Sequence, residues 1–382
     1  MKTARIWDIF CKVVDNYGDI GVCWRLAADL ASRGQKVRLW VDLPEALEWM
    51  APGALEGEWP RIEVRPWHEL QNNATTSALA PADAWVEGFG CEVSAELQEI
   101  TFCSAAAAGN NRRMGPVWIN LEYLTAEGVA ERNHGLPSPL MHGPARGRTR
   151  FFFYPGFFPG TGGLVREPGL EQRLLDFDRS EWLASKGIDW HGEQLVSLFC
   201  YEPESLANLL DQLRNSAKPT LLLVTHGRAA AAVRHVLGLS ESAFSNRTGQ
   251  ITAGSLSITF LLPLSQIDFD NLLWSCDLNF VRGEDSLVRA IWAGKPFVWQ
   301  IYSQHDDAHH AKLNAFLILM EAPASWRTFH LAWNGVVKLA LPQMDLVGWS
   351  AALAKARYKL LELPDLTQSL LEFADDEKRA SG

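Results

Sequence analysis

The chain has 382 residues, 47% of them hydrophobic and 21% charged, which is the composition of a globular protein long enough for two domains. Its formal net charge of −10 at pH 7 disfavours a nucleic-acid-binding protein, because contacts to phosphate need a basic surface. Six cysteines without a C-x-x-C pair, no secretory signal and no membrane-spanning apolar run together predict a cytoplasmic protein with reduced thiols.

The first half of the chain alternates strand-like and helix-like segments. Runs of β-branched and aromatic residues predict strands, and apolar residues at helical spacing predict helices. Strands that alternate with helices favour right-handed crossovers and a mostly parallel sheet. The predicted strands are 4–14, 35–42, 61–67, 82–90 and 116–124, and the predicted helices are 20–30, 43–50 and 94–102.

The middle of the chain, residues 132–169, is rich in proline and glycine and lacks a clear periodicity. This pattern predicts long loops around one aromatic strand, RTRFFFYPGFF, followed by a linker. The GTGG stretch at 160–163 neither follows a buried strand nor opens a helix. It therefore lacks the context of a dinucleotide-binding loop.

The alternation of strands and helices resumes after residue 190. We therefore expect an α/β protein of two Rossmann-like αβα domains that face each other across a cleft, with ligands at the carboxyl ends of the strands. The expected divisions are 1–185, 186–360 and, for a C-terminal helix and tail, 361–382. The predicted strands are 193–202, 219–227, 256–264, 277–283 and 295–302, and the predicted helices are 205–216, 229–238, 268–276, 284–294 and 307–320.

The turn RGEDS, Arg282 to Ser286, follows a buried strand and opens a helix. Acid and hydroxyl residues suit helix caps, so one interpretation is a capping cluster. The alternative is an anion site, because backbone N–H groups at a helix start hold phosphate and Arg282 adds positive charge. We favour the anion site because the turn lies at the carboxyl end of a strand.

Two other stretches resemble metal sites. Asp268 and Asp270 form a D-x-D pair, but acids at a helix start are explained by the helix dipole, while Phe269 and Gln266 suit a nucleobase. The stretch 305–310 carries three histidines and two aspartates, which we interpret as a solvated, acid-capped helix start rather than a metal site.

The loop DNYGD places Asp15 and Asp19 directly after the first predicted strand. Asp15 as a turn residue and Asp19 as the N-cap of a helix beginning at Ile20 is the structural interpretation. The functional one is that a carboxylate at this edge of the sheet acts as a general base. The pair is better explained by function, because the structural interpretation suits one aspartate and not both.

Three long stretches resemble one known family. They are KVVDNYGDIGVCWRLAADLASRGQKVRLWVD, FFFYPGF and DFDNLLWSCDLNFVRGEDSLVRAIWAGKPFVWQIY, and the likeness runs from roughly Met1 to Leu370. Together they resemble EarP, the bacterial protein-arginine rhamnosyltransferases that modify elongation factor P. The resemblance implies a GT-B fold and an inverting transfer of L-rhamnose from dTDP-β-L-rhamnose to an arginine of elongation factor P. It also implies that the reaction needs no cofactor and no metal.

The resemblance further implies the site residues. Asp15 and Asp19 match an essential acidic pair and Glu284 matches an essential acid of the second half. We expect Asp19 to be the base while Asp15 positions the guanidinium or supports Asp19, although either can be the base. The residues that we assign to donor binding are Asn16, Tyr17, Gly18, Phe199, Tyr201, Gln266, Phe269, Arg282, Gly283, Asp285, Ser286 and Tyr302.

Two alternatives to this function stay open. One is a GT-B transferase with another nucleotide sugar or another acceptor. The other is a module that binds elongation factor P or a nucleotide sugar without turnover, which leaves the two aspartates unexplained. A nicotinamide or flavin enzyme is disfavoured because no G-x-G-x-x-G follows a strand.

Overall fold

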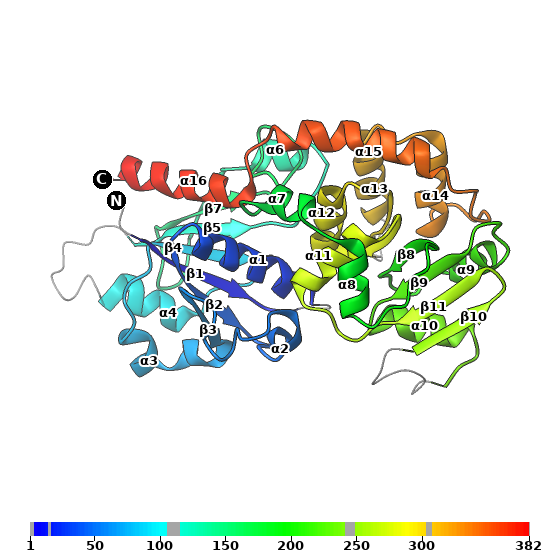
Figure 1. Ribbon diagram of the computed structural model, residues 1–382. Coiled ribbons are helices and arrows are strands. Elements are labelled where there is room, and N and C mark those ends of the chain that lie inside the picture. The colour runs from blue at the N-terminus through cyan, green and yellow to red at the C-terminus, as the bar shows by residue number, and fades with distance from the viewer. Residues whose placement is uncertain (1–3, 14–16, 105–114, 241–248, 303–307, 382) are drawn as a thin grey trace. The chain divides into compact units, whose positions relative to one another are not determined.

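The computed structural model describes residues 4–13, 17–104, 115–240, 249–302 and 308–381 (Figure 1). The chain forms two compact units, of which the first contains Met1–Pro168 and Leu363–Gly382 and the second contains Gly169–Glu362. The division expected at 185/186 thus falls inside the second unit, at the end of α8 (Arg179–Ser185). Among the described residues, no helix has both the length and the apolar character that crossing a membrane requires.

Unit 1 is built on a seven-stranded sheet in the order β3-β2-β1-β4-β5-β7-β6. Neighbouring strands are parallel except β6, which pairs antiparallel with β7. The mostly parallel sheet expected from the alternation of elements is therefore confirmed. The strands are β1 (Ile6–Cys11), β2 (Lys36–Val41), β3 (Ile62–Pro66), β4 (Ala84–Gly88), β5 (Val117–Leu121), β6 (Pro137–Pro139) and β7 (Thr149–Phe153).

Alternating side chains of β1 pack on opposite faces of this sheet. Ile9 belongs to a core with α1 and α16, whereas Phe10 stacks among the buried tryptophans Trp40, Trp85 and Trp118 on the other face. These tryptophans therefore serve the core of the sheet, and Trp299 of unit 2 is also buried. The helices of unit 1 are α1 (Gly18–Ser32), α2 (Ala46–Met50), α3 (Asn73–Ser77), α4 (Ala95–Glu99), α6 (Val129–Asn133) and α16 (Leu366–Ser381), with a 3₁₀ turn at Trp67–Gln71 and a π turn at Ile100–Ser104.

The end of the chain returns to unit 1 as α16, which lies beside α1 in Figure 1. Its Leu366, Leu370 and Ala374 are buried in the core of the sheet. Leu164 forms a parallel bridge with Asp365, and a Cβ atom on Gly163 would lie 2.1 Å from the carbonyl oxygen of Pro364. The glycines of the GTGG stretch thus allow two distant segments to cross closely and do not form a nucleotide loop.

Unit 2 contains a six-stranded sheet in the order β10-β11-β9-β8-β12-β13, parallel except for the β10–β11 hairpin. Its strands are β8 (Gln194–Leu198), β9 (Thr220–Val224), β10 (Gly249–Ala253), β11 (Leu256–Phe260), β12 (Leu278–Arg282) and β13 (Phe297–Gln300). Its remaining helices are α7 (Leu170–Leu175), α9 (Leu206–Arg214), α10 (Arg228–Val236), α11 (Gln266–Ser275), α12 (Gly283–Ala293), α13 (Ala308–Leu319), α14 (Ala324–Trp333) and α15 (Leu346–Leu361).

Both sheets reverse the direction of their strand order at one point. In unit 1 the reversal separates β1 from β4, and in unit 2 it separates β8 from β12. In open parallel sheets, ligands bind outside the carboxyl ends of the strands at such a switch point. The fold therefore predicts that ligands bind to the residues that follow β1 and β4 in unit 1 and to those that follow β8 and β12 in unit 2.

Candidate active site

Arg282, the last residue of β12, lies over two aromatic rings at the switch point of unit 2. Its guanidinium carbon is 4.5 Å from the centre of the Phe199 ring and 4.6 Å from that of Tyr201, and Nη1 donates to the carbonyl of Cys200 at 3.2 Å. Burial lowers the pKa of Arg282, and the neighbouring cation Arg228 lowers it further. A desolvated guanidinium without a carboxylate partner among the described residues is suited to an anionic ligand.

Tyr201 is held from several sides. Its N–H donates to Oε1 of Gln300 at 2.8 Å, and its ring lies edge-to-face with Tyr302 at 5.7 Å. The guanidinium of Arg228 lies 4.9 Å from the ring centre, so Tyr201 contacts the cations of both Arg228 and Arg282. Burial raises the pKa of the Tyr201 hydroxyl. Arg228 is paired with Glu202, so the ring lies between a paired cation and the Arg282 guanidinium.

The proposed base-binding residues also come together. Phe199 and Phe269 meet edge-to-face with ring centres 5.2 Å apart, and both are partly exposed. Gln266 is the first residue of α11 and is likewise partly exposed. Phe199 follows β8 and Phe269 lies on α11, so the sheet and one helix together supply the rings. A planar base can stack on either ring because every base offers a π-face.

The backbone at the start of α12 has a conformation that lets a ligand approach it closely. Gly283 has φ +64°, a left-handed conformation that favours glycine, and its carbonyl accepts from Nε1 of Trp299 at 2.9 Å. The Ser286 hydroxyl accepts from the N–H of Arg282 at 3.0 Å, while the N-cap residue has no side-chain cap. Ser286 thus caps the helix in the reciprocal sense, because it satisfies the N–H of the N-cap residue from inside the first turns. The N–H groups of a helix's first turn have no acceptor within the helix, so this turn suits a phosphate.

Glu284 forms an ion pair that the sequence does not reveal. Its Oε1 lies 2.6 Å from Nζ of Lys312 on α13, and both side chains are mostly buried. Asp285 follows it in the same first turn of α12, partly exposed. The ion pair holds Glu284 in one orientation, which is what a carboxylate that binds a sugar hydroxyl requires.

The D-x-D pair is structural. Nε1 of Trp182 donates to Asp268 at 3.1 Å, and Lys186 forms an ion pair with the same carboxylate at 2.8 Å. Burial raises the pKa of Asp268, but the hydrogen bonds from Lys186 and Trp182 outweigh it and the pKa is lowered. Asp270 is buried and accepts two hydrogen bonds from Arg289, at 2.8 and 2.6 Å. The interpretation of these acids as helix-start residues is confirmed for Asp268, and Asp270 joins α11 to α12.

In unit 1, the residues after β1 begin α1 earlier than expected. The helix begins at Gly18, with Tyr17 as the N-cap residue, so Asp19 lies inside the first turn and its expected role as N-cap is wrong. A carboxylate in the first turn interacts favourably with the helix dipole. Tyr17 is half exposed and lies edge-to-face with Trp49 at 5.7 Å. Asp15 and Asn16, two further predicted site residues, lie outside the described residues.

Asp19 lies at the carboxyl edge of the unit 1 sheet. A hydrogen bond with the Cys23 thiol and burial raise the pKa of Cys11, the last residue of β1, and the charge of Asp19 raises it further. A Cβ atom on Gly88, the last residue of β4, would lie 2.8 Å from Sγ of Cys23. The first turns of α1 therefore pack on the ends of β1 and β4, at the switch point.

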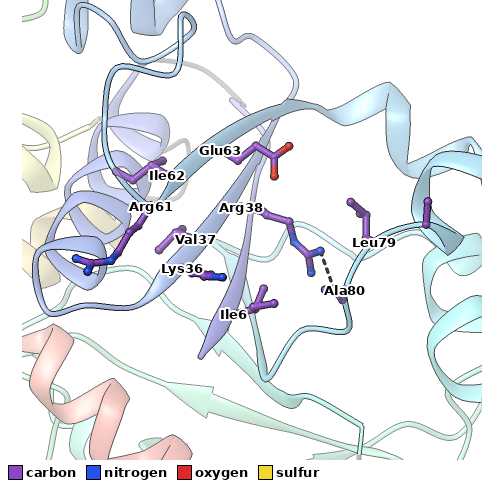
Figure 2. A pocket seen from close by; sticks show the side chains of 10 residues that line it. Ile6, Lys36, Val37, Arg38, Arg61, Ile62, Glu63, Leu79 and Ala80 are labelled. Atoms are coloured by element: carbon purple, nitrogen blue, oxygen red, sulfur yellow. Dashed lines mark hydrogen bonds between the residues drawn. The ribbon is translucent and has the colours of Figure 1, made fainter. Parts of the chain in front are cut away.

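Other candidate sites carry less chemistry. In the part of the chain that the structure describes, no group of three or more His, Cys, Asp or Glu residues could hold a metal. His309 is buried, while 305–307 lie outside the described residues. Figure 2 shows a pocket of about 390 Å³ at the amino ends of β1–β3, the edge opposite the switch point. Its Arg38 is already paired with the buried carboxylate of Asp8 and donates to the carbonyl of Ala80.

Sequence reasoning missed two residues of the unit 2 site. Arg228 follows β9 in the stretch VTHGR, the same strand, glycine and helix pattern as VRGEDS, so the sequence contained a signal for it. Lys312 lies inside a helix without a motif, and only the fold brings it to Glu284. All the unit 2 residues predicted from the sequence lie at the carboxyl edge of that unit's sheet or on the helices that start there.

Comparison with known proteins gives a family. Residues 7–375 match the family model described as Elongation-Factor P (EF-P) rhamnosyltransferase EarP. The chain is 41% identical over 396 residues to a protein-arginine rhamnosyltransferase of Pseudomonas aeruginosa, which covers 97% of this chain and 99% of that protein. A protein of the same name from Pseudomonas putida is 43% identical over 346 residues, with 86% of each chain covered.

Solved structures show the same likeness. The structure described as "Structural basis for EarP-mediated arginine glycosylation of translation elongation factor EF-P" matches with a TM-score of 0.63 and 30% identity, covering 97% of this chain and 99% of that one. MurG of Acinetobacter baumannii matches with a TM-score of 0.50 and 13% identity over 98% of this chain and 100% of that one, a likeness of fold alone. The expected GT-B architecture of two Rossmann-like domains is confirmed.

Proposed function

The chain belongs to the EarP family of elongation factor P rhamnosyltransferases, and from this membership we propose that it transfers L-rhamnose from dTDP-β-L-rhamnose to an arginine of elongation factor P. The observation that carries the proposal is the setting of Arg282, a desolvated cation over two rings at the start of α12. This arrangement supports a ligand that is both aromatic and anionic, as a nucleoside diphosphate is.

The donor contacts follow from the charge and shape of unit 2. The thymine stacks on the Phe199 and Phe269 rings, and the amide of Gln266 hydrogen-bonds its edge. Arg282 and the first turn of α12 bind the diphosphate, with Gly283 and Ser286 shaping the turn. Glu284, oriented by Lys312, accepts a hydrogen bond from a rhamnose hydroxyl.

The transfer replaces one bond at the anomeric carbon of rhamnose. A guanidinium nitrogen of the acceptor arginine forms the new N–C bond as the C–O bond to the diphosphate breaks, and dTDP leaves with the bonding electron pair. Asp19 accepts the proton that the guanidinium nitrogen loses. A guanidinium is delocalised and cationic, and hence a poor nucleophile, so a carboxylate is needed both to orient it and to take the proton.

No metal is needed for the leaving group in this mechanism. The charge that develops on dTDP is stabilised by Arg282 and the start of α12, which are already in position. The protein acts in the cytoplasm, where its acceptor, a translation factor, works.

The first test is intact mass spectrometry of elongation factor P after incubation with the protein, dTDP-β-L-rhamnose and EDTA. The expected result is a gain of one deoxyhexose that maps to an arginine. A gain that needs added divalent metal contradicts the metal-independent mechanism. No gain, while dTDP still binds, contradicts the proposed donor or acceptor and directs the search to other sugars and proteins.

A further inference from the structure

Phe89 has the backbone conformation of a strained residue. It directly follows β4 at the switch point of unit 1, and its φ of +57° is left-handed. Its N–H donates to the carbonyl of Leu121 at 2.8 Å. A side chain in this conformation is strained relative to an ordinary backbone, and such strain concentrates at functional sites. Glycine, which stands on both sides of Phe89, would avoid the cost.

The Phe89 ring stacks on Tyr123. The ring centres are 4.7 Å apart with an angle of 25° between the planes. Phe89 also packs against the core, whereas the Tyr123 side chain is 43% exposed. Tyr123 follows β5, the strand next to β4. The pair therefore presents a supported aromatic surface to solvent at the carboxyl edge of the sheet.

Glu122, the residue before Tyr123, adds a carboxylate to this surface. Its Oε1 accepts from Nδ2 of Asn120 at 2.6 Å. Burial raises the pKa of Glu122, although Arg150 and the amide of Asn120 lower it. Arg150 forms its ion pair with Glu87 instead, at 2.9 Å. The charge of Glu122 in turn contributes to the raised pKa of Tyr154, after burial. Glu122 is thus a partly desolvated acid that a cation would stabilise.

This surface is continuous with the position of Asp19. Gly88 immediately precedes Phe89 and lies against Cys23, as the contact to its Cβ position shows. Asp19 and Cys23 are four residues apart on α1, so they share one face of the helix. Asp19, Phe89 and Tyr123 therefore follow three adjacent strands, β1, β4 and β5, at one edge of one sheet.

We propose that Phe89, Tyr123 and Glu122 form the subsite that binds the acceptor arginine, with its guanidinium on the Tyr123 ring and paired with Glu122. The inference rests on the proposed function and names the part of unit 1 that recognises the acceptor. A guanidinium stacks on aromatic faces and pairs with carboxylates in plane, and this surface offers both.

The subsite gives an explanation for the strain at Phe89. A glycine after β4 would relieve the strain but would leave the Tyr123 ring without its stacking partner. A tyrosine that rotates freely loses conformational entropy when a ligand fixes it, and a supported one loses less. The strained residue therefore serves to preorganise the exposed ring.

The test is steady-state kinetics of wild-type protein and three variants with elongation factor P and dTDP-β-L-rhamnose. Tyr123→Ala is expected to raise the acceptor KM about tenfold or more, while the donor KM and the Kd for dTDP stay unchanged. Tyr123→Phe keeps the ring and is expected to retain the wild-type acceptor KM. Glu122→Gln is expected to raise the acceptor KM by about tenfold as well.

A matched control and a folding control accompany these variants. Tyr358→Ala removes a tyrosine that is 68% exposed on α15 of unit 2, and should leave all constants unchanged. Phe89→Gly removes the stacking partner of Tyr123, so the acceptor KM is expected to rise, and urea unfolding of this variant checks that the fold is retained. This combination separates a binding role from a structural one.

The outcomes distinguish this inference from the proposed function. Transfer by the wild type with an unchanged acceptor KM in Tyr123→Ala and Glu122→Gln overturns the subsite and keeps the function. A rise of donor and acceptor KM together also overturns it, because the effect is then general. Absence of transfer by the wild type rejects the proposed function, and the subsite with it.

Discussion

The switch points of the two units both combine aromatic rings with charged side chains, but the charges next to the rings are opposite in sign. In unit 2, the edge after β8 and β12 combines the Phe199 and Tyr201 rings with the cations Arg282 and Arg228. In unit 1, the edge after β1, β4 and β5 combines the Phe89–Tyr123 ring pair with the carboxylates of Asp19 and Glu122. One edge is suited to an anionic, aromatic ligand and the other to a planar cation.

The difference predicts that the donor diphosphate and the acceptor guanidinium are bound mainly by different units, with Tyr17 and Gly18 of unit 1 also assigned to the donor. The Arg282 guanidinium attracts a diphosphate, whereas the carboxylates of Asp19 and Glu122 attract the guanidinium of an arginine. Changes in one unit should therefore affect one substrate, and the predictions below use this separation.

The largest effect is expected for Asp19→Asn. Loss of the general base should lower kcat about 10³-fold, within the range that proton-transfer catalysis supplies, while dTDP binds to unit 2 as before. Calorimetric titration with dTDP and mass-spectrometric rate measurement test both parts. Asp42→Asn, which changes an aspartate that follows β2 in the same unit, is the control and should keep kcat. Substantial turnover by Asp19→Asn would mean that another group takes the proton.

Each unit contains a buried arginine–aspartate pair, and breaking either should destabilise the protein. Arg289→Met leaves Asp270 buried without its partner in unit 2, and Arg38→Met does the same to Asp8 in unit 1. Each is expected to cost about 3–5 kcal/mol in the free energy of unfolding, measured in urea. Only Arg289→Met should also weaken dTDP binding, because the pair joins α11 and α12, which carry Phe269 and the RGEDS turn. Equal loss of dTDP affinity in both would contradict this.

Arg282→Met should have the opposite pattern to Asp19→Asn, because it changes the binding of dTDP, which Asp19→Asn leaves unchanged. Removing the guanidinium is expected to weaken dTDP binding about 100-fold, as expected when charged hydrogen bonds are lost, and to leave the acceptor KM unchanged. Arg282→Lys keeps the charge without the planar group over Phe199 and Tyr201, so it should recover only part of the affinity. Titration with dTDP and with thymidine separates the diphosphate contribution, because thymidine binding should change little.

One histidine in each unit accepts a backbone hydrogen bond, and the two should make the free energy of unfolding depend on pH to different extents. His330 accepts from the N–H of Trp299 in unit 2, and His134 accepts from the N–H of Tyr154 in unit 1. Burial lowers the pKa of His330 to about 4 from 6.5, and it lowers the pKa of the less buried His134 by less. Between pH 6.5 and 4 the unfolded chain binds a proton that folded unit 2 does not, so stability falls as the pH falls.

The expected slope from His330 is about 1.4 kcal/mol of unfolding free energy per pH unit in this window. Urea unfolding between pH 7 and pH 5 measures it. His330→Gln retains a hydrogen-bond acceptor without the titration and should have a shallower slope by about one proton. Identical slopes in the two proteins would show that His330 does not cause the loss.

The sheets were largely predictable from the sequence because each strand is an apolar run with strong β-propensity. The segment 277–283 was predicted as a strand and forms β12 at Leu278–Arg282, and the helix after it begins one residue from the expected position. The start of α1 at Gly18 was missed, since the helix uses Tyr17 and not an aspartate as its N-cap residue. Capping preferences favour Asp and Ser but do not exclude tyrosine.

The site was predictable where its residues follow strands and not where the fold brings them from elsewhere. Arg282 and Ser286 belong to a strand–glycine–helix pattern, which the sequence displays. Lys312 contacts Glu284 from a position 28 residues further along the chain. The strain at Phe89 is a property of its backbone angle, which the residue type does not predict. The aromatic run RTRFFFYPGFF was predicted as a strand and contains β7, in which Phe153 is fully buried and packs against Phe373 of α16.

The return of the chain to unit 1 has a consequence for biosynthesis. Gly163 and Leu164 meet Pro364 and Asp365, and α16 completes the core of a sheet whose first strand begins at Ile6. A ribosome releases residues in order, and domains tend to fold as they emerge. Unit 2 is contiguous in sequence, so it can close while unit 1 still lacks its last helix. The unit that is begun first is therefore finished last, after unit 2 has been synthesised.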